Sequence, residues 1–261
     1  MEPTIPISYL DLLIAGVLVF ASMAVSWRLQ LGLEKELFWG IIRSFLQLSA
    51  TGYVLLFVIN RATRGEWYWV LLALGIMLGV AVHTAQGRIK EPLPGKALVF
   101  TVAIVSGSVS VLLFVLVLVL HQYQPWLKAQ YVLPLAGMIT GNAMNAGAVA
   151  VSRFVGDLRS RRAEIETALA LGATPAQAVH PLRRDALRTA IMPSVNGMLV
   201  VGVVSLPGMM TGQIIAGQDP LQAVHYQIMV VYMITAASLF TAVIAIIGTI
   251  RQSFTAAQQL R

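Results

Sequence analysis

The sequence predicts an all-α, polytopic integral membrane protein. Hydrophobic residues make up 57% of its 261 residues and charged residues 11%, and its mean hydropathy is +0.78. Soluble domains carry about 25% charged residues, so this chain has more apolar surface than a soluble core needs. The apolar residues fall into seven stretches, each near or above the roughly 20 residues that a helix needs to cross a bilayer.

We expect transmembrane helices at residues 9–27, 37–60, 67–86, 97–120, 131–152, 190–216 and 223–250. No Lys or Arg precedes the first stretch, which favours a retained span over a cleaved signal peptide. Short connections favour a single domain, 1–261, and the lack of a clear internal repeat disfavours an inverted-repeat carrier. The one long polar interval, 153–189, separates the fifth and sixth spans.

Positive charge predicts how these spans are oriented, because cytoplasmic segments are enriched in Lys and Arg. With the N-terminus outside, 14 of the 18 Lys and Arg residues are cytoplasmic, 3 are outside and Arg43 lies within a span. The C-terminus and the interval 153–189 are then cytoplasmic. Interfacial aromatic residues gather at the predicted outer surface, namely Trp67, Trp69, Tyr123, Trp126 and Tyr131. This distribution explains the basic charge by topology and argues against nucleic-acid binding.

Two spans carry residues that interrupt a helix or let another helix approach closely. The fifth holds Pro134 and the pair Gly137 and Gly141, whose Gly-x-x-x-Gly spacing permits close helix packing. The sixth holds Pro207-Gly208, which breaks a helix unless protein or water satisfies the freed backbone groups. Irregular backbone at that depth usually lines a cavity. Residues 208–220 either dip back toward the membrane or form a plain loop.

The interval 153–189 contains a predicted helix, turn and helix. Four residues recur at the spacing of one helix face: Ile165, Ala168, Leu169 and Gly172. Gly172 also suits the end of the helix, because glycine adopts positive φ without a Cβ clash. Residues 174–177, Thr-Pro-Ala-Gln, form a capping box for the next helix. Helices this small cannot form a core of their own, so the segment needs a partner.

Two resemblances identify that partner. Glu166-Thr167-Ala168 followed by Gly172 resembles the Glu-Ala-Ala…Gly signature of ABC importer permeases, whose cytoplasmic helix docks in a groove of the ATPase. Nearly the whole chain is similar to the FetB (YbbM) family of iron-exporting permease subunits, which are related to plant aluminium-tolerance proteins. Four ordered motifs carry this second resemblance: residues 134–144, PLAGMITGNAM; 171–175, LGATP; 205–212, SLPGMMTG; and 226–230, YQIMV.

The resemblance implies a permease subunit of an ABC transporter in the bacterial inner membrane, exporting iron or another metal ion. The chain lacks a Walker A motif, so a separate, FetA-like ATPase must bind the nucleotide. The resemblance also implies a complex of two permease copies and two ATPases in the lipid membrane. It implies no cofactor in the permease. The residues expected to transmit the ATPase motion are Glu164, Glu166, Ala168, Leu169, Leu171, Gly172, Ala173 and Thr174.

Polar residues inside the spans are candidates for a translocation pathway. Arg43 is the costliest, at about +2.5 to +3.5 kcal/mol at mid-helix on insertion scales, and Gln47 lies on the same helix face. One interpretation is that Arg43 and Gln47 line the pathway. The other is that the long Arg43 side chain extends along the helix and places its charge at the cytoplasmic edge of the membrane. Neutral groups near the two interrupted spans either line the pathway or join helices to one another, namely Thr140, Asn142, Asn145, Thr211 and Gln213, beside Pro207 and Gly208.

Metal chemistry receives little support from the residue types. Four methionines lie near the interrupted spans, namely Met138, Met144, Met209 and Met210. Their thioethers suit Cu(I), but methionine also fills gaps in apolar packing. His83 and His225 fall at opposite predicted faces, and no acidic residue lies deep in a span. With no cysteine, thiolate sites and disulfides are excluded. The metal site is therefore unknown, and iron rests on the resemblance alone.

Three other classes of membrane protein compete with the permease. An ion-coupled secondary transporter would want a titratable residue near the midplane, and only Arg43 is a candidate. An intramembrane hydrolase would want a His-Glu-x-x-His or Gly-x-Ser-x-Gly motif, and neither occurs. A non-transporting scaffold would use the interval 153–189 to bind a regulator. The sequence leaves the solute and the direction of transport open.

Overall fold

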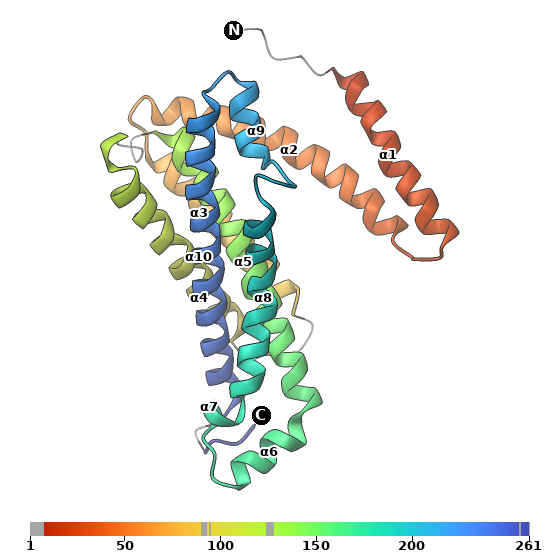
Figure 1. The fold of residues 1–261 in the computed structure, drawn as a ribbon, viewed down its shortest axis with the longest axis vertical. Coiled ribbons are helices and arrows are strands. Elements are labelled where there is room, and N and C mark those ends of the chain that lie inside the picture. Colours follow the sequence, from red (N-terminus) through yellow and green to blue (C-terminus); the bar gives the residue numbers. More distant parts are fainter. Residues whose placement is uncertain (1–7, 90–92, 94, 124–127, 256, 261) are drawn as a thin grey trace.

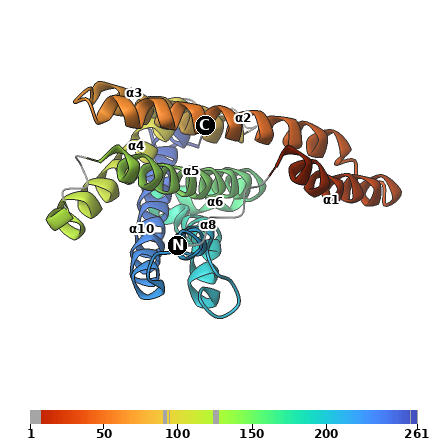
Figure 2. The same cartoon turned by 90° about the horizontal axis from the view of Figure 1, so that it is seen from above.

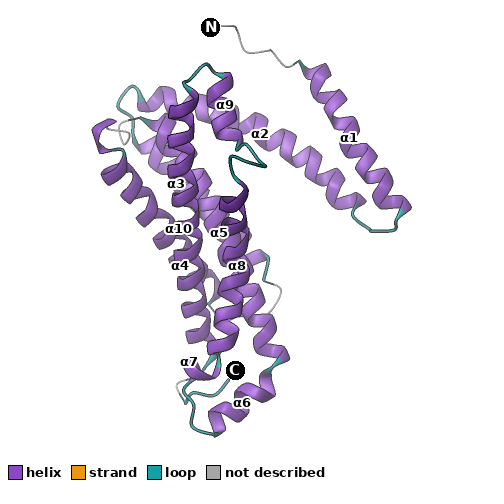
Figure 3. Ribbon diagram, viewed as in Figure 1, coloured by secondary structure: helices purple, strands orange, loops and turns teal. Residues whose placement is uncertain are grey.

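The computed structural model describes residues 8–89, 93, 95–123, 128–255 and 257–260, and these form helices and connecting turns without a β-strand (Figure 3). The all-α class is confirmed. Lys90 and Arg261, two of the 14 Lys and Arg residues counted above as cytoplasmic, and Trp126 at the predicted outer surface lie outside the described residues. The helices are α1 (Tyr9–Arg28), α2 (Glu34–Ala62), α3 (Tyr68–Gly87), α4 (Lys96–Phe114), the π-helix η1 (Val115–Val119), the 3₁₀ turn η2 (His121–Tyr123), α5 (Ala129–Ser160), α6 (Arg162–Ala170), α7 (Pro175–Ala178), α8 (His180–Val200), α9 (Gly208–Ile215) and α10 (Pro220–Ser253).

Five of the described helices are long and apolar enough to cross a membrane: α1, α2, α3, α4 with η1, and α10. They correspond to the first four and the last of the predicted spans. The fifth predicted span, 131–152, lies in the first three quarters of α5, which contacts α3, α4, α8 and α10. Because these neighbours enclose it, α5 can carry small and polar residues, and it continues through Pro134 without a break.

The sixth predicted span is not one helix. α8 begins at His180, ten residues before the predicted start of the span at 190, and ends at Val200. Residues 201–207 are irregular, with Gly202 at a φ of +83°, and α9 follows from Gly208. The break predicted at Pro207-Gly208 therefore extends over a longer stretch. Residues 208–220 are mostly the helix α9 and a turn into α10, instead of a plain loop.

The molecule consists of a compact bundle and a projecting hairpin (Figures 1 and 2). The bundle contains α3, α4, α5, α8 and α10, whereas α1 and the first half of α2 extend away from it. We call the end of the bundle that carries α6, α7 and the end of α10 the inner end. The end where α5 and α10 begin is the outer end.

The bundle is held together midway along its length where three helices meet. Thr241 of α10 is fully buried, and its side chain fills the space left by Gly107 of α4 and Gly147 of α5. A Cβ added at Gly107 would come within 3.0 Å of the Thr241 backbone nitrogen, and one at Gly147 within 3.2 Å of Thr241 Cγ2. Closer to the inner end, Gly248 of α10 likewise leaves space that the Val99 side chain of α4 occupies. The helix backbones can approach this closely because glycine has no side chain.

We predict that Gly107→Leu destabilises the protein in detergent by about 1–3 kcal/mol, because the Thr241 backbone cannot yield to the added side chain. Gly79→Leu is the matched control, since a Cβ at Gly79 meets nothing within 4 Å. Chemical unfolding followed by circular dichroism measures both. Equal stability of the two variants would contradict the proposed close contact.

Candidate functional site

The segment between α5 and α8 folds as a helix, a sharp turn and a second, one-turn helix at the inner end (Figure 1). Gly172 has a φ of +93°, its N–H donates to the Leu169 carbonyl, and the Ala173 N–H donates to the Ala168 carbonyl, both at 3.0 Å. This pair of hydrogen bonds is a Schellman motif, which ends a helix with a glycine in the left-handed region. The predicted end of the first helix at Gly172 is confirmed.

The predicted capping box is also present. The Gln177 N–H donates to Thr174 Oγ1 at 3.4 Å, and the Thr174 N–H donates to Gln177 Oε1 at 2.9 Å. Pro175 is the first residue of α7. These bonds satisfy two amides that the helix start would leave open, so the turn from α6 into α7 has a defined shape.

Part of the apolar stripe of α6 packs against the rest of the protein. Ile165 is only 2% exposed, and Leu169 packs partly buried against the same core. This inner core runs without interruption from α6 into α4, α5, α8 and α10; its members include Phe100, Ile104, Phe154, Ile165, Val179, Leu182 and Ile246. A movement of α6 would therefore displace the helices that share this core with it.

The tip of the turn is the most exposed apolar part of this segment. Leu171 is 84% exposed, the largest exposed apolar side chain of this segment, and Gly172 beside it is exposed as well. Among the residues predicted to transmit motion, Leu171, Gly172 and Thr174 are exposed, whereas Ala168, Leu169 and Ala173 are partly covered. The docking contact expected around Leu169, Leu171 and Gly172 stays a prediction; of these three residues, Leu171 and Gly172 are exposed.

The two glutamates of α6 pair with this chain's own arginines. Arg161 donates to Glu164 at 2.6 Å, and Arg162 donates to Glu166 at 2.7 Å. The hydrogen bond from Arg161 lowers the pKa of Glu164 from its ordinary value. Both carboxylates are exposed, so neither pair is a strong constraint.

Residues 254, 255 and 257–260 form a turned segment, which we call the C-terminal hook and which sequence analysis missed. Phe254 is buried in the inner core, Leu260 packs against it, and the Thr255 N–H donates to the Gln259 carbonyl at 2.8 Å. A cleft of about 540 Å³ lies between the hook and α6, lined on one side by Glu166, Leu169 and Ala173 and on the other by Ala257, Gln258, Gln259 and Leu260. Leu260 gave no periodic signal, because the hook is not part of a helix.

The polar residues predicted on α5 lie at different depths and make different contacts. Thr140 is buried, and Asn142 Nδ2 donates to the Met138 carbonyl of its own helix at 2.9 Å. Asn145 is exposed, and its Oδ1 accepts a 2.7 Å hydrogen bond from Arg88, at the end of α3. Arg88 is one of the 14 Lys and Arg residues counted above as cytoplasmic, and the sequence did not predict its contact with α5, because that contact depends on the fold.

Around the break before α9, some of the predicted residues shape the start of this helix and another lines a pocket. Pro207 is the N-cap of α9, which begins at Gly208, and Thr211 Oγ1 donates to the Pro207 carbonyl at 3.0 Å. Gln213 Oε1 is buried and has no hydrogen-bond partner among the described residues. Gln213 lines a pocket of about 420 Å³ at the outer end, which we call the outer pocket. Its other polar lining residues are Lys128, Tyr131, Gln218, Gln222, His225 and Tyr226.

Arg43 and Gln47 lie on α2, apart from the α5 and α9 residues. Both side chains are exposed, and Arg43 makes no hydrogen bond or ion pair with any described residue. Gln47 lines a groove of about 730 Å³ between α2 and α3. A single chain therefore does not gather all the predicted pathway residues around one space.

The described residues contain no cluster of three or more His, Asp or Glu side chains that could hold a metal ion. Met138 and Met209 pack against the outer part of the core, Met144 packs against the inner core, and Met210 is buried. His83 is exposed on α3, and His225 lines the outer pocket. The methionines are thus placed as packing residues.

Comparison with known proteins shows similarity along nearly the whole chain. The family described as "Uncharacterised protein family (UPF0014)" matches residues 9–254. The chain is 38% identical to the "UPF0014 membrane protein slr1647" of Synechocystis sp., over 94% of this chain and 93% of that protein. It is 37% identical to "Protein ALUMINUM SENSITIVE 3" of Arabidopsis thaliana, over 95% and 88% of the two chains. It is 35% identical to the "Probable iron export permease protein FetB" of Escherichia coli, over 96% and 93%. No solved structure matches the chain.

We predict that Ile165→Ala loosens the whole turn, because removing a fully buried isoleucine side chain costs about 2–5 kcal/mol. Backbone hydrogen exchange across 162–178 should rise strongly. In the control Leu171→Ala, exchange should stay near the wild-type level, since Leu171 contacts little of its own chain. If the two variants exchanged alike, Ile165 would not be the anchor of α6.

Proposed function

The chain belongs to the UPF0014 family of membrane proteins, and on that premise we propose that it is the permease subunit of an ABC transporter. Family membership confirms the resemblance drawn from the sequence motifs. The named permease among its relatives supports transport in place of catalysis. We propose iron or another metal ion as the solute and export as the direction, because that relative is named a probable iron export permease.

We propose that a separate ATPase subunit drives the transport and docks at the α6–α7 turn. The observation that carries this proposal is the contrast between Ile165, 2% exposed, and Leu171, 84% exposed. One side of the segment is built into the inner core and the other presents an apolar tip to the surroundings. A rigid element with this arrangement can transmit displacement from a partner into α4, α5, α8 and α10. The contact is proposed to involve Glu164, Glu166, Ala168, Leu169, Leu171, Gly172, Ala173 and Thr174, within the segment 153–189 of one permease domain, 1–261.

We propose that two copies of the chain enclose the pathway and that each copy binds one ATPase. Arg43 is exposed on a hairpin that leaves the bundle, and a charged side chain inside a membrane should face protein or water. Val203, 90% exposed, lies in the irregular stretch between α8 and α9, and such backbone is tolerated only beside protein or in a water-filled cavity. A second copy would meet both requirements. The proposed pathway residues are Arg43, Gln47, Thr140, Asn142, Asn145, Pro207, Gly208, Thr211 and Gln213.

In the proposed arrangement the inner end faces the cytoplasm of a bacterial cell and the chain spans the inner membrane several times. α1 begins and α10 ends at opposite ends of the molecule, and α6, α7 and the C-terminal hook share the inner end (Figure 1). The excess of Lys and Arg assigned to that side supports the same orientation. ATP is present there, as docking of the ATPase requires.

Gly172→Trp and Leu171→Asp should each lower permease-stimulated ATP turnover in the reconstituted complex by about tenfold or more, the effect expected if docking weakens by at least that factor below saturation. The first variant adds bulk at the tip and the second removes its apolar contact. Gly75→Trp adds the same bulk on α3, where a Cβ meets nothing within 4 Å, and should leave turnover unchanged.

Membrane insertion of all three variants is checked by their yield in the detergent extract. Unaltered turnover in both Leu171→Asp and Gly172→Trp would contradict docking at this turn. If no ATPase subunit copurified with the wild-type chain, the ABC permease assignment itself would be wrong.

A further inference from the structure

We propose that the cleft between α4–η1 and α10 is a phospholipid-binding site, with an acyl chain in an apolar groove and the phosphate in the outer pocket. The inference rests on the chain being a membrane protein and on the described residues of this cleft. It does not depend on the ATPase, the solute or the direction of transport.

The groove exists because α4 and α10 separate toward the outer end. They are in close contact at Gly107 and Thr241, and the groove begins one turn further along α4, at Ser110 and Val111. From there α4 and η1 lean away from α10 (Figure 1). The π-helical turn, Val115–Val119, lies in the wall of the groove and widens the helix locally. The resulting space has a volume of about 690 Å³.

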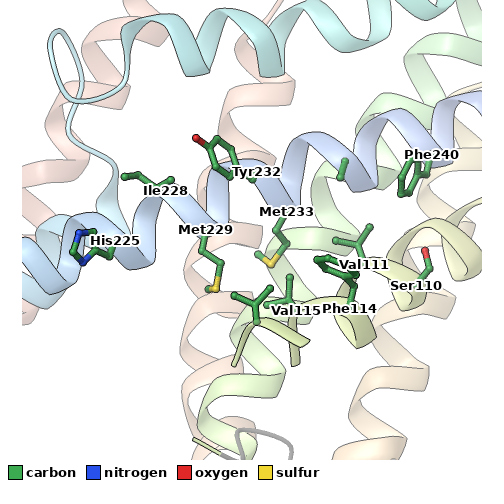
Figure 4. Close-up of a pocket in the computed structure, with 12 residues that line it drawn as sticks. Ser110, Val111, Phe114, Val115, His225, Ile228, Met229, Tyr232, Met233 and Phe240 are labelled. Carbon is green, nitrogen blue, oxygen red and sulfur yellow. The ribbon is translucent and has the colours of Figure 1, made fainter. Parts of the chain in front are cut away.

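The walls of the groove are almost entirely apolar. Met229 and Met233 of α10 point toward Phe114 and Val115 across the space (Figure 4). Polar groups enter its lining only through Ser110, Tyr232 and His225. A void with such walls loses dispersion contacts unless hydrocarbon fills it, and flexible methionines adapt to an irregular guest. An ion would find no set of ligands here, so an acyl chain is the fitting occupant.

The groove opens into the outer pocket, because Val119, His225 and Met229 line both spaces. Lys128 lines the outer pocket, with its ammonium 6.0 Å from the centre of the Tyr131 ring. No described carboxylate lies within salt-bridge distance of Lys128. Asp219, next to the pocket in sequence, accepts from the Leu221 N–H and caps α10. The ammonium is therefore available to a phosphate.

The amide side chains of Gln218 and Gln222 line the same pocket and add neutral donors. A cation and amide donors at one end of a long apolar groove match the two parts of a phospholipid. Basic pockets between membrane helices bind lipid head groups in the same way. The geometry points to one lipid held by both parts, more tightly than the lipids around the rest of the surface.

Native mass spectrometry of the purified full-length protein, titrated with dioleoyl phosphatidylglycerol, tests the site. The wild-type chain should retain one lipid after mild activation. Ala236→Trp and Ser110→Trp fill the groove from opposite walls and should each lower retention about tenfold, or 1.4 kcal/mol. Leu239→Trp is the matched control on α10, because Leu239 is exposed but does not line the groove. It should retain lipid as the wild type does.

A second arm separates the lipid from a free phosphate compound. Lys128→Glu should lower retention of phosphatidylglycerol several-fold, and glycerol 3-phosphate at the same concentration should not displace the lipid. Full retention in both groove-filling variants would overturn the site. Displacement by glycerol 3-phosphate would overturn the acyl-chain contribution. A third outcome is that the wild type is a dimer without bound lipid and that both groove-filling variants are monomers. That outcome would overturn the lipid site and assign the groove to a second copy of the chain.

Discussion

The contact of Thr241 with Gly107 and Gly147 is the constraint on which the rest of the bundle depends. It brings α4, α5 and α10 together at one point, where their backbones can approach because two of the three residues have no side chain. Thr241 and Ser108 place buried hydroxyl groups at this junction without a partner among the described residues. Shape, more than polar bonding, therefore holds the three helices together.

The junction divides the molecule into two halves with different properties. Toward the inner end the helices stay packed, and one apolar core reaches Ile165 of α6 and Phe254 of the C-terminal hook. Toward the outer end α4 leans away, α8 gives way to an irregular stretch, and two connected cavities open. The inner half is thus closely packed, whereas the outer half contains the open spaces.

The sequence predicted what local chemistry determines. Positive φ at Gly172, the capping box of Thr174 and Gln177, and the break at Pro207 depend on a few neighbouring residues, and each was found. The sequence did not predict contacts that depend on segments far apart in the chain. It did not show that Leu169 packs partly buried against the bundle, or that Arg88 bonds to Asn145, 57 residues away in the chain. Leu260 packs against the core from a segment without periodicity, so no pattern marked it. The boundaries of the sixth span were wrong because α8 extends beyond its apolar part.

The central claim is that the α6–α7 turn faces the compartment that contains ATP. The chain has no cysteine, so Leu171→Cys introduces a single thiol at the exposed tip. A membrane-impermeant maleimide should label this thiol in inside-out vesicles and leave it unlabelled in intact spheroplasts. Labelling in spheroplasts, or none in either preparation, would contradict the account.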